Sequence, residues 1–153
     1  MAGAEGDCSI LDHCHHTGID IHEYFEIEVR RRCMKIEGKQ VLIVGLGRSG
    51  LTAARFLKRR GAVLTIADTA SESQLGNAVD RVKDMGIGLE LGGHRTASFT
   101  RTDLIVLSPG VPHTLAPIEA ARKKGISVIG EFELASRFIR EPIIGVTGTN
   151  GKT

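Results

Sequence analysis

From residue 34 onward, short apolar runs alternate with segments whose apolar positions recur every three or four residues. The short runs have the length of buried strands and occupy residues 40–44, 62–67, 88–91, 103–107 and 127–129. The periodic segments predict helices at residues 51–60, 71–85, 117–124 and 131–139. Strands that alternate with helices indicate right-handed crossovers, so we expect an α/β domain whose open parallel sheet carries helices on both faces.

Residues 1–33 differ in composition from the rest of the chain. They contain all three cysteines and four of the six histidines, and they carry seven acidic residues against three arginines. The candidate zinc ligands are Cys8, His13, Cys14, His15, His16 and His22. The spacing of these cysteines and histidines matches no paired zinc framework, so chance or tag-like composition is favoured over a metal site. We expect residues 1–33 to be a non-native or disordered extension, with Met34 as the natural start.

The first strand is followed by a glycine-rich turn, Gly45-Leu46-Gly47-Arg48-Ser49-Gly50. This G-x-G-x-x-G spacing, with Asp68 at the end of the next strand, is the fingerprint of Rossmann-like dinucleotide-binding domains. The fingerprint requires only a diphosphate resting on a helix N-terminus, so NAD, FAD or another nucleoside diphosphate satisfies it. Asp68 is a candidate acceptor for a ribose hydroxyl or a base N–H, and the alternative is a turn or cap residue.

A second turn, Ser108-Pro109-Gly110-Val111-Pro112, follows the fourth predicted strand. It lies at the carboxyl end of that strand, which is the edge where open α/β sheets bind ligands. Two prolines around a glycine favour a rigid loop, so we expect the Ser108 hydroxyl to face the same crevice as Gly47. A purely structural tight turn is the alternative.

The end of the chain predicts a second phosphate site. Pro142 marks a boundary, and residues 143–146 form a short apolar run of strand length. The next residues are Gly148-Thr149-Asn150-Gly151-Lys152-Thr153. They are similar to the G-x-x-x-x-G-K-[ST] phosphate-binding loop, although Val146 occupies the position of the first glycine in that pattern. In this interpretation the loop binds ATP, Lys152 counters phosphate charge and Thr153 is a ligand of Mg²⁺. A glycine-rich turn that ends a strand is the alternative.

The order of these motifs resembles the amino-terminal part of the Mur ligases. The resemblance covers residues 34–153 and rests on Val41 to Gly50, Asp68-Thr69, Leu104 to Pro112, Gly130-Glu131-Phe132-Glu133-Leu134 and Val146 to Thr153. The turns at 45–50 and 108–111 favour the D-glutamate-adding branch of the family. The resemblance implies a UDP-substrate-binding domain at 34–140 and the start of a central, truncated ATP-binding domain at 141–153.

For the complete protein, the resemblance implies an ATP- and Mg²⁺-dependent ligase of peptidoglycan synthesis. Such a ligase converts a carboxylate of UDP-N-acetylmuramoyl-L-alanine to an acyl phosphate, which the amine of D-glutamate attacks. By motif, the diphosphate is assigned to Gly47, Arg48 and Ser49, the uracil end to Asp68 and Thr69, and the pocket wall to Ser108, Pro109 and Gly110. The ATP phosphates are assigned to Gly148 through Thr153, with Lys152 and Thr153 as catalytic residues. We expect the 153-residue chain to bind the UDP-sugar without turnover.

Charge and hydropathy exclude several other classes. A formal charge of +2 is too small to indicate nucleic-acid binding, and no apolar run approaches the ~20 residues that cross a bilayer. The absence of cysteine after residue 33 suits the cytoplasm, and we expect a monomer. Glu131 and Glu133 are expected to begin a helix and to complement its dipole. The alternatives are an NAD-dependent oxidoreductase domain, another Mur- or folylpolyglutamate-type ligase, and a non-catalytic nucleotide-binding module.

Overall fold

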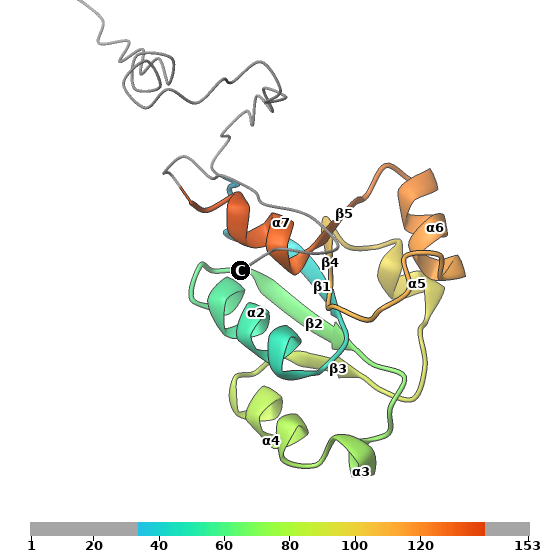
Figure 1. Ribbon diagram of the computed structural model, residues 1–153. Coiled ribbons are helices and arrows are strands. Elements are labelled where there is room, and N and C mark those ends of the chain that lie inside the picture. The colour runs from blue at the N-terminus through green and yellow to red at the C-terminus, as the bar shows by residue number, and fades with distance from the viewer. Residues whose placement is uncertain (1–33, 140–153) are drawn as a thin grey trace, which may run out of the picture. The chain divides into compact units, whose positions relative to one another are not determined.

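The predicted strands form a single parallel sheet in the computed structural model, which describes residues 34–139. The strands are β1 (Gln40–Val44), β2 (Val63–Ala67), β3 (Gly88–Glu90), β4 (Leu104–Leu107) and β5 (Ser127–Gly130). Their order in the sheet is β3-β2-β1-β4-β5, and every pairing is parallel (Figure 1). The chain therefore moves outward from β1 to β3 and then returns to place β4 on the other side of β1. This reversal is the switch point at which open α/β sheets bind ligands.

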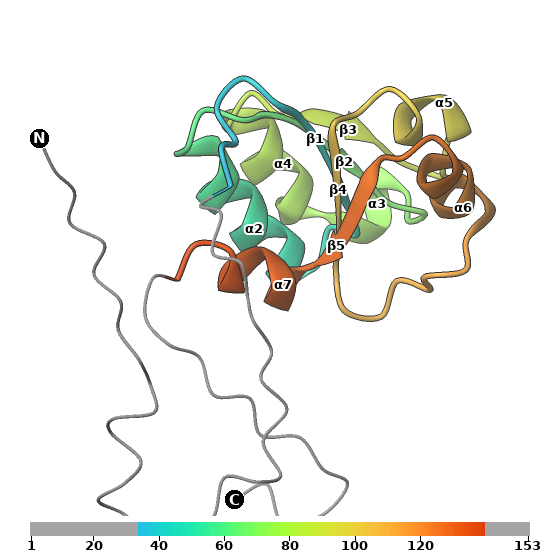
Figure 2. The same ribbon diagram turned by 90° about the horizontal axis from the view of Figure 1, so that it is seen from above.

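Helices cover both faces of the sheet, as the sequence predicts (Figure 2). One face carries α2 (Arg48–Lys58), α4 (Asn77–Asp84) and α7 (Glu131–Ser136), and the other carries α5 (Thr96–Phe99) and α6 (Ala116–Lys123). Residues of β1 alternate between the two cores: Val41 and Ile43 pack toward α2, whereas Leu42 and Val44 pack toward α5 and α6. Burial on both faces explains why these strands are continuous apolar runs.

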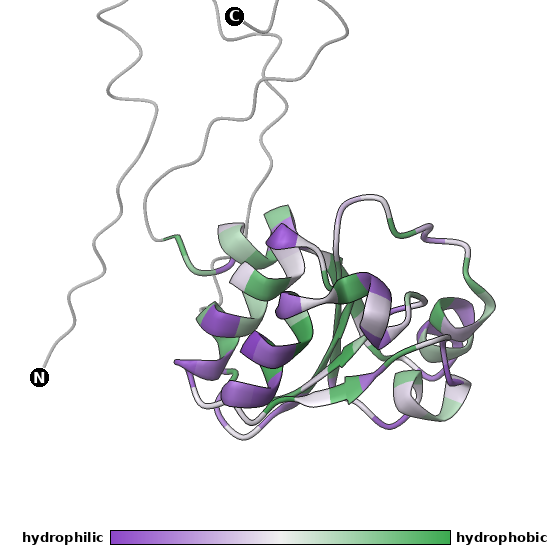
Figure 3. Ribbon diagram, turned by 90° about the horizontal axis from the view of Figure 1, so that it is seen from below, coloured by the Kyte–Doolittle hydropathy of each residue, from purple (hydrophilic) through white to green (hydrophobic). Residues whose placement is uncertain are grey.

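Hydropathy follows this layering. The strands at the centre of the domain are apolar, and polar residues lie on the outward faces of the helices (Figure 3). Ile43, Ile66 and Ile105 of the three central strands are completely buried. Within residues 34–139, no helix is long and apolar enough to cross a membrane.

Apart from shifts of one to three residues at helix ends, such as α2 beginning at 48 instead of 51 and α7 ending at 136 instead of 139, the structure corrects the predicted helices in two places. The single helix expected at 71–85 is two helices, α3 (Glu72–Leu75) and α4, because Gly76 between them adopts φ 50° and ψ −132°. Ser71 and Gln74 form a capping box that begins α3. The one-turn helix α5 was not predicted, because its only buried residue is Phe99 and one apolar position establishes no periodicity.

Candidate functional site

Four adjacent strands end at the same level of the sheet, and the residues that follow them form a row. The register pairs Val44 of β1 with Ala67 of β2 and with Leu107 of β4, and it pairs Leu107 with Gly130 of β5. The next residue along each strand therefore belongs to one row, hereafter the edge row: Asp68, Gly45, Ser108 and Glu131. Backbone hydrogen bonds continue the ladder into this row, from the Gly45 N–H to the Ala67 carbonyl at 2.8 Å and from the Ser108 N–H to the Val44 carbonyl at 3.0 Å.

The glycine turn between β1 and α2 is closed on its inner side and open on its outer side. A Cβ atom on Gly50 would lie 2.0 Å from the Gly45 carbonyl oxygen, and one on Gly45, whose φ is 100°, would lie 3.0 Å from the Ser108 Cβ. Only glycine fits these two positions. In contrast, a Cβ on Gly47 would meet nothing within 4 Å. The turn thus leaves space beside Gly47, at the N-terminus of α2, where a ligand can approach the backbone.

Asp68 connects two loops at one end of the edge row. Its Oδ2 accepts a hydrogen bond from the Leu46 N–H at 2.6 Å, and its Oδ1 accepts one from the Ala70 N–H at 2.8 Å. The carboxylate therefore holds the glycine turn against the loop that follows β2. This is the turn role given above as the alternative, and each oxygen keeps a second lone pair for a ligand.

Ser108 is buried, with 8% of its surface exposed. Its Oγ lies 3.1 Å from the Gly45 carbonyl oxygen and 3.0 Å from Glu131 Oε1. The hydroxyl is thus directed toward the glycine turn and α7, while the following Pro109 and Gly110 are exposed. The Val111 N–H donates to the Ser108 carbonyl at 3.1 Å, so the loop also has the tight-turn character given as the alternative.

A groove of about 650 Å³ runs between α2 and α7, beside the edge row. Its polar lining includes Arg48, Ser49 and Glu131, and its apolar lining includes Phe56 and Leu134. Arg48 is exposed and Ser49 is half-buried. Two of the residues predicted to meet a diphosphate therefore face an open, accessible space.

Comparison with known proteins identifies the family that shares this arrangement. The model of the MurD-like N-terminal domain of Mur ligases matches residues 39–130, which include the whole sheet. The chain belongs to this family.

Relatives of this Mur ligase domain are named UDP-N-acetylmuramoylalanine--D-glutamate ligase. The protein of Desulfosudis oleivorans is 57% identical over 120 residues, which are 78% of this chain and 26% of that protein. The protein of Koribacter versatilis is 49% identical over the same number of residues, again 78% of this chain and 26% of the relative. The chain thus spans about a quarter of the length of these relatives.

A solved structure agrees with the family assignment. The pseudomurein peptide ligase type C from Methanothermus fervidus aligns with a TM-score of 0.55 and 28% sequence identity. The alignment covers 75% of this chain and 24% of that one.

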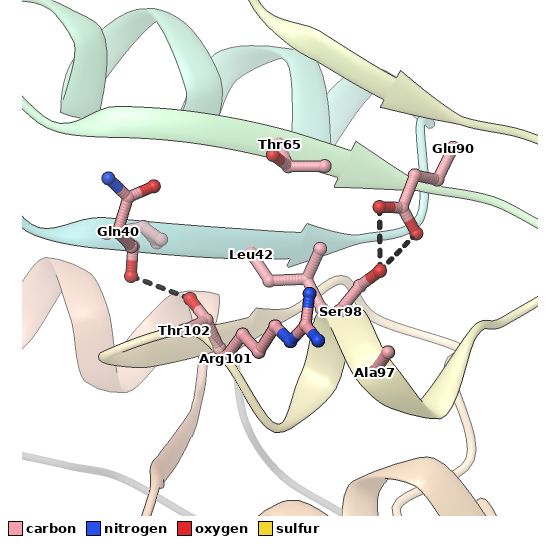
Figure 4. A pocket seen from close by; sticks show the side chains of 9 residues that line it. Gln40, Leu42, Thr65, Glu90, Ala97, Ser98, Arg101 and Thr102 are labelled. Carbon is pink, nitrogen blue, oxygen red and sulfur yellow. Dashed lines mark hydrogen bonds between the residues drawn. The ribbon is translucent and has the colours of Figure 1, made fainter.

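The Mur ligase domain has a second hollow, of about 260 Å³, on the face of the sheet that carries α5 (Figure 4). Its lining is polar and includes Gln40, Thr65, Glu90, Ser98 and Arg101. Because α5 is a single turn, it leaves this part of β1, β2 and β3 uncovered. The Glu90 carboxylate accepts from the Ser98 hydroxyl at 2.6 and 2.7 Å. None of the residues predicted to bind a ligand lines this hollow.

The remaining predicted residues divide into two groups. Thr69 is exposed beside Asp68, at the carboxyl edge of the sheet. The predicted ATP residues, Gly148 through Thr153, lie outside the described residues, as do the cysteines and histidines of residues 1–33. Within residues 34–139, no three His, Cys, Asp or Glu side chains gather as metal ligands.

The sequence did not predict that Glu131 belongs to the candidate site. Glu131 begins α7 as expected, but its carboxylate also contacts Ser108. The signal that could have revealed it is its position directly after β5, which matches the position of Asp68 directly after β2.

Proposed function

We propose that this chain is the UDP-substrate-binding part of an ATP-dependent ligase that joins D-glutamate to UDP-N-acetylmuramoyl-L-alanine. The observation that carries the proposal is the glycine turn at the switch point of a MurD-like domain, closed against Ser108 and open at Gly47. The names of the relatives support the choice of substrates. In the complete protein the reaction proceeds through an acyl phosphate, in the cytoplasm, and the protein acts as a monomer.

The start of α2 provides the groups that a diphosphate requires. The first N–H groups of an α-helix have no partner within the helix, and Gly47 supplies no side-chain cap to occupy them. These N–H groups and the positive end of the helix dipole favour an anion at this point. Arg48, which is exposed in the first turn, adds a full positive charge. The diphosphate therefore rests on Gly47, Arg48 and Ser49.

The two neighbouring loops give the nucleotide its direction. Asp68 and Thr69 follow β2, on one side of the turn, and are assigned to the uracil end. Ser108, Pro109 and Gly110 follow β4, on the other side, and form the wall toward the sugar. The groove between α2 and α7 then adjoins the part of the substrate that carries the reacting carboxylate.

ATP and Mg²⁺ are assigned to residues 141–153, which begin the ATP-binding domain in this proposal. Their fit rests on the donor set in the sequence. Backbone N–H groups of Gly148 to Gly151 suit phosphate oxygens, Lys152 is a cation for the γ-phosphate, and the Thr153 hydroxyl is a ligand that Mg²⁺ accepts. When bound, ATP supplies the phosphoryl group that activates the carboxylate.

Isothermal titration calorimetry of the 153-residue chain with three ligands tests the proposal. We expect binding of UDP-N-acetylmuramoyl-L-alanine, weaker binding of UDP and no binding of NAD. Arg48→Ala should weaken binding about tenfold, because a charge-assisted hydrogen bond to phosphate is lost. Arg55→Ala removes another exposed cation of α2 and should leave binding unchanged. Binding of NAD without binding of either UDP compound would refute the proposal in favour of a nicotinamide-dependent oxidoreductase domain.

A further inference from the structure

Glu131 is the charged member of the edge row that the family motifs do not place in the substrate site. A role for Glu131 in that site rests on the proposed function, because it is measured as binding of the UDP substrate. The structural basis of this role is independent of any ligand and lies in the contacts of Ser108.

Ser108 is the only buried polar residue within the described part of the chain. A buried hydroxyl is costly unless it is hydrogen-bonded, so its partners determine where it can lie. Those partners come from two distant segments: the Gly45 carbonyl at 3.1 Å and Glu131 Oε1 at 3.0 Å. A serine hydroxyl has one proton, which it can donate to either acceptor.

The side of Ser108 that faces the glycine turn cannot move closer to that turn. The Cβ positions of Gly45 and Gly50 are already closed by Ser108 and by the Gly45 carbonyl. The Ser108 N–H donates to the Val44 carbonyl at 3.0 Å, which anchors the first residue of the loop. On the other side, the half-buried side chain of Glu131 is the partner that holds the hydroxyl.

The sheet places Glu131 where it can make this contact. Gly130 pairs with Leu107, so Glu131 and Ser108 are neighbours in the edge row although they are 23 positions apart in the sequence. Glu131 also lines the groove that contains Arg48 and Ser49. Its carboxylate thus reaches from α7 to the loop after β4 at the border of the predicted diphosphate site.

We propose that Glu131 is a positioning residue of the UDP-substrate site: by holding the Ser108 hydroxyl, it sets the distance between the Ser108–Gly110 loop and the glycine turn. The substrate spans both loops, so the spacing between them determines how well it fits. Glu131 needs an oxygen at the correct reach for this role, and it does not need a negative charge.

Two substitutions separate this role from that of a residue which only complements the helix dipole. Glu131→Gln removes the charge and keeps an acceptor oxygen at the same reach, whereas Glu131→Asp keeps the charge at the start of α7 but is one methylene shorter. Positioning predicts that Glu131→Gln retains the affinity of the wild type within about twofold and that Glu131→Asp binds about tenfold more weakly, which is the scale of one hydrogen bond. A dipole role predicts the opposite order.

The experiment measures the dissociation constant of UDP-N-acetylmuramoyl-L-alanine for the 153-residue chain by calorimetry. Glu133→Gln and Glu133→Asp are matched controls, because Glu133 lies in the first turn of the same helix, is exposed and pairs with Arg137. Both controls should bind like the wild type. Ser108→Ala should weaken binding, and adding Glu131→Asp to it should cause no further loss, because both changes remove the same contact.

Amide hydrogen exchange of the ligand-free variants gives a second measurement, in case a variant binds poorly because it is partly unfolded. Exchange should be faster in Glu131→Asp than in the wild type at Leu46, Gly47 and Val111, whose N–H donates to the Ser108 carbonyl within the loop, and unchanged in the β-strands. If the wild type binds and Glu131→Asp matches it in affinity and in exchange, the positioning role is refuted. If the wild type fails to bind either UDP compound, the proposed function fails, whatever the exchange of the variants.

Discussion

Replacing Gly50 with alanine is expected to destabilise the domain, although the same change in most helices is stabilising. Alanine in a helix interior is favoured over glycine by up to about 1 kcal/mol. At Gly50, however, the new Cβ would lie 2.0 Å from the Gly45 carbonyl oxygen and 2.9 Å from Ser108 Oγ. Contacts below 3.0 Å do not occur for real Cβ atoms, so the Gly45 carbonyl must move by about 1 Å or the start of α2 must shift.

The size of the effect follows from what that movement disturbs. Overpacking of this kind costs about 1–3 kcal/mol. Moving the Gly45 carbonyl also disturbs its contact with the Ser108 hydroxyl, which contributes up to about 1 kcal/mol when the hydroxyl donates to this carbonyl. The gain in helix propensity offsets part of this loss. We therefore expect a net decrease of about 2 kcal/mol in the free energy of unfolding, or about 10 °C in the midpoint of thermal unfolding.

Urea and thermal unfolding followed by circular dichroism measure this decrease. Gly47→Ala is the matched control, because it adds the same methyl group three residues earlier, at a position with open space and φ −83°. Its stability should lie within about 1 kcal/mol of the wild type, the scale of an N-cap change. A Gly50→Ala protein that unfolds at or above the wild-type temperature would show that the turn does not pack as closely as the distances indicate.

Three further outcomes are expected. Gly47→Ala should weaken binding of UDP-N-acetylmuramoyl-L-alanine at least fivefold in calorimetry, since its methyl group fills the space beside the N–H groups of α2; unchanged affinity would exclude a diphosphate there. Asp68→Asn should lower the free energy of unfolding by about 1–3 kcal/mol, because Leu46 and Ala70 donate to different carboxylate oxygens and the amide nitrogen that replaces one of them cannot accept; a urea midpoint equal to that of the wild type would contradict this. Phe138→Ala should lower the free energy of unfolding by about 2 kcal/mol, because the Phe138 ring packs edge-on against Phe56, with the ring centroids 5.0 Å apart, and its centroid lies 4.9 Å from the Arg60 guanidinium; a urea midpoint equal to that of the wild type would contradict this packing.

The strands could be predicted from the sequence because both faces of a parallel sheet are buried. Residues 41–44 and 104–107 are therefore unbroken apolar runs, and glycines or polar residues mark their ends. The helices were harder to predict where their apolar pattern was short. Nothing in the periodicity of residues 71–85 reveals the break at Gly76, whose backbone conformation ends α3. The single turn of α5 buries Phe99 alone and is too short to establish a period.

The candidate site was predictable to the extent that it is encoded by local motifs. The glycine spacing and the aspartate after the second strand predict that Gly47 and Asp68 lie at the same edge of the sheet. The structure confirms this location, at the carboxyl ends of β1 and β2. The contact of Glu131 with Ser108 depends instead on the register between β4 and β5, which comes from packing across the whole sheet. The sequence pattern therefore indicates only the local role of Glu131 at the start of a helix.

The edge row also explains how a site for an anionic ligand tolerates two carboxylates. Asp68 and Glu131 stand at opposite ends of the row, and each accepts a hydrogen bond from a protein donor in a neighbouring segment. Such bonds direct the carboxylate oxygens toward the protein. The centre of the row, Gly45 and Ser108, is uncharged, and the open backbone at Gly47 and the guanidinium of Arg48 lie beyond it. Under the proposed function, a diphosphate meets N–H groups and a cation, while the two carboxylates keep the proposed role of maintaining the spacing of the loops.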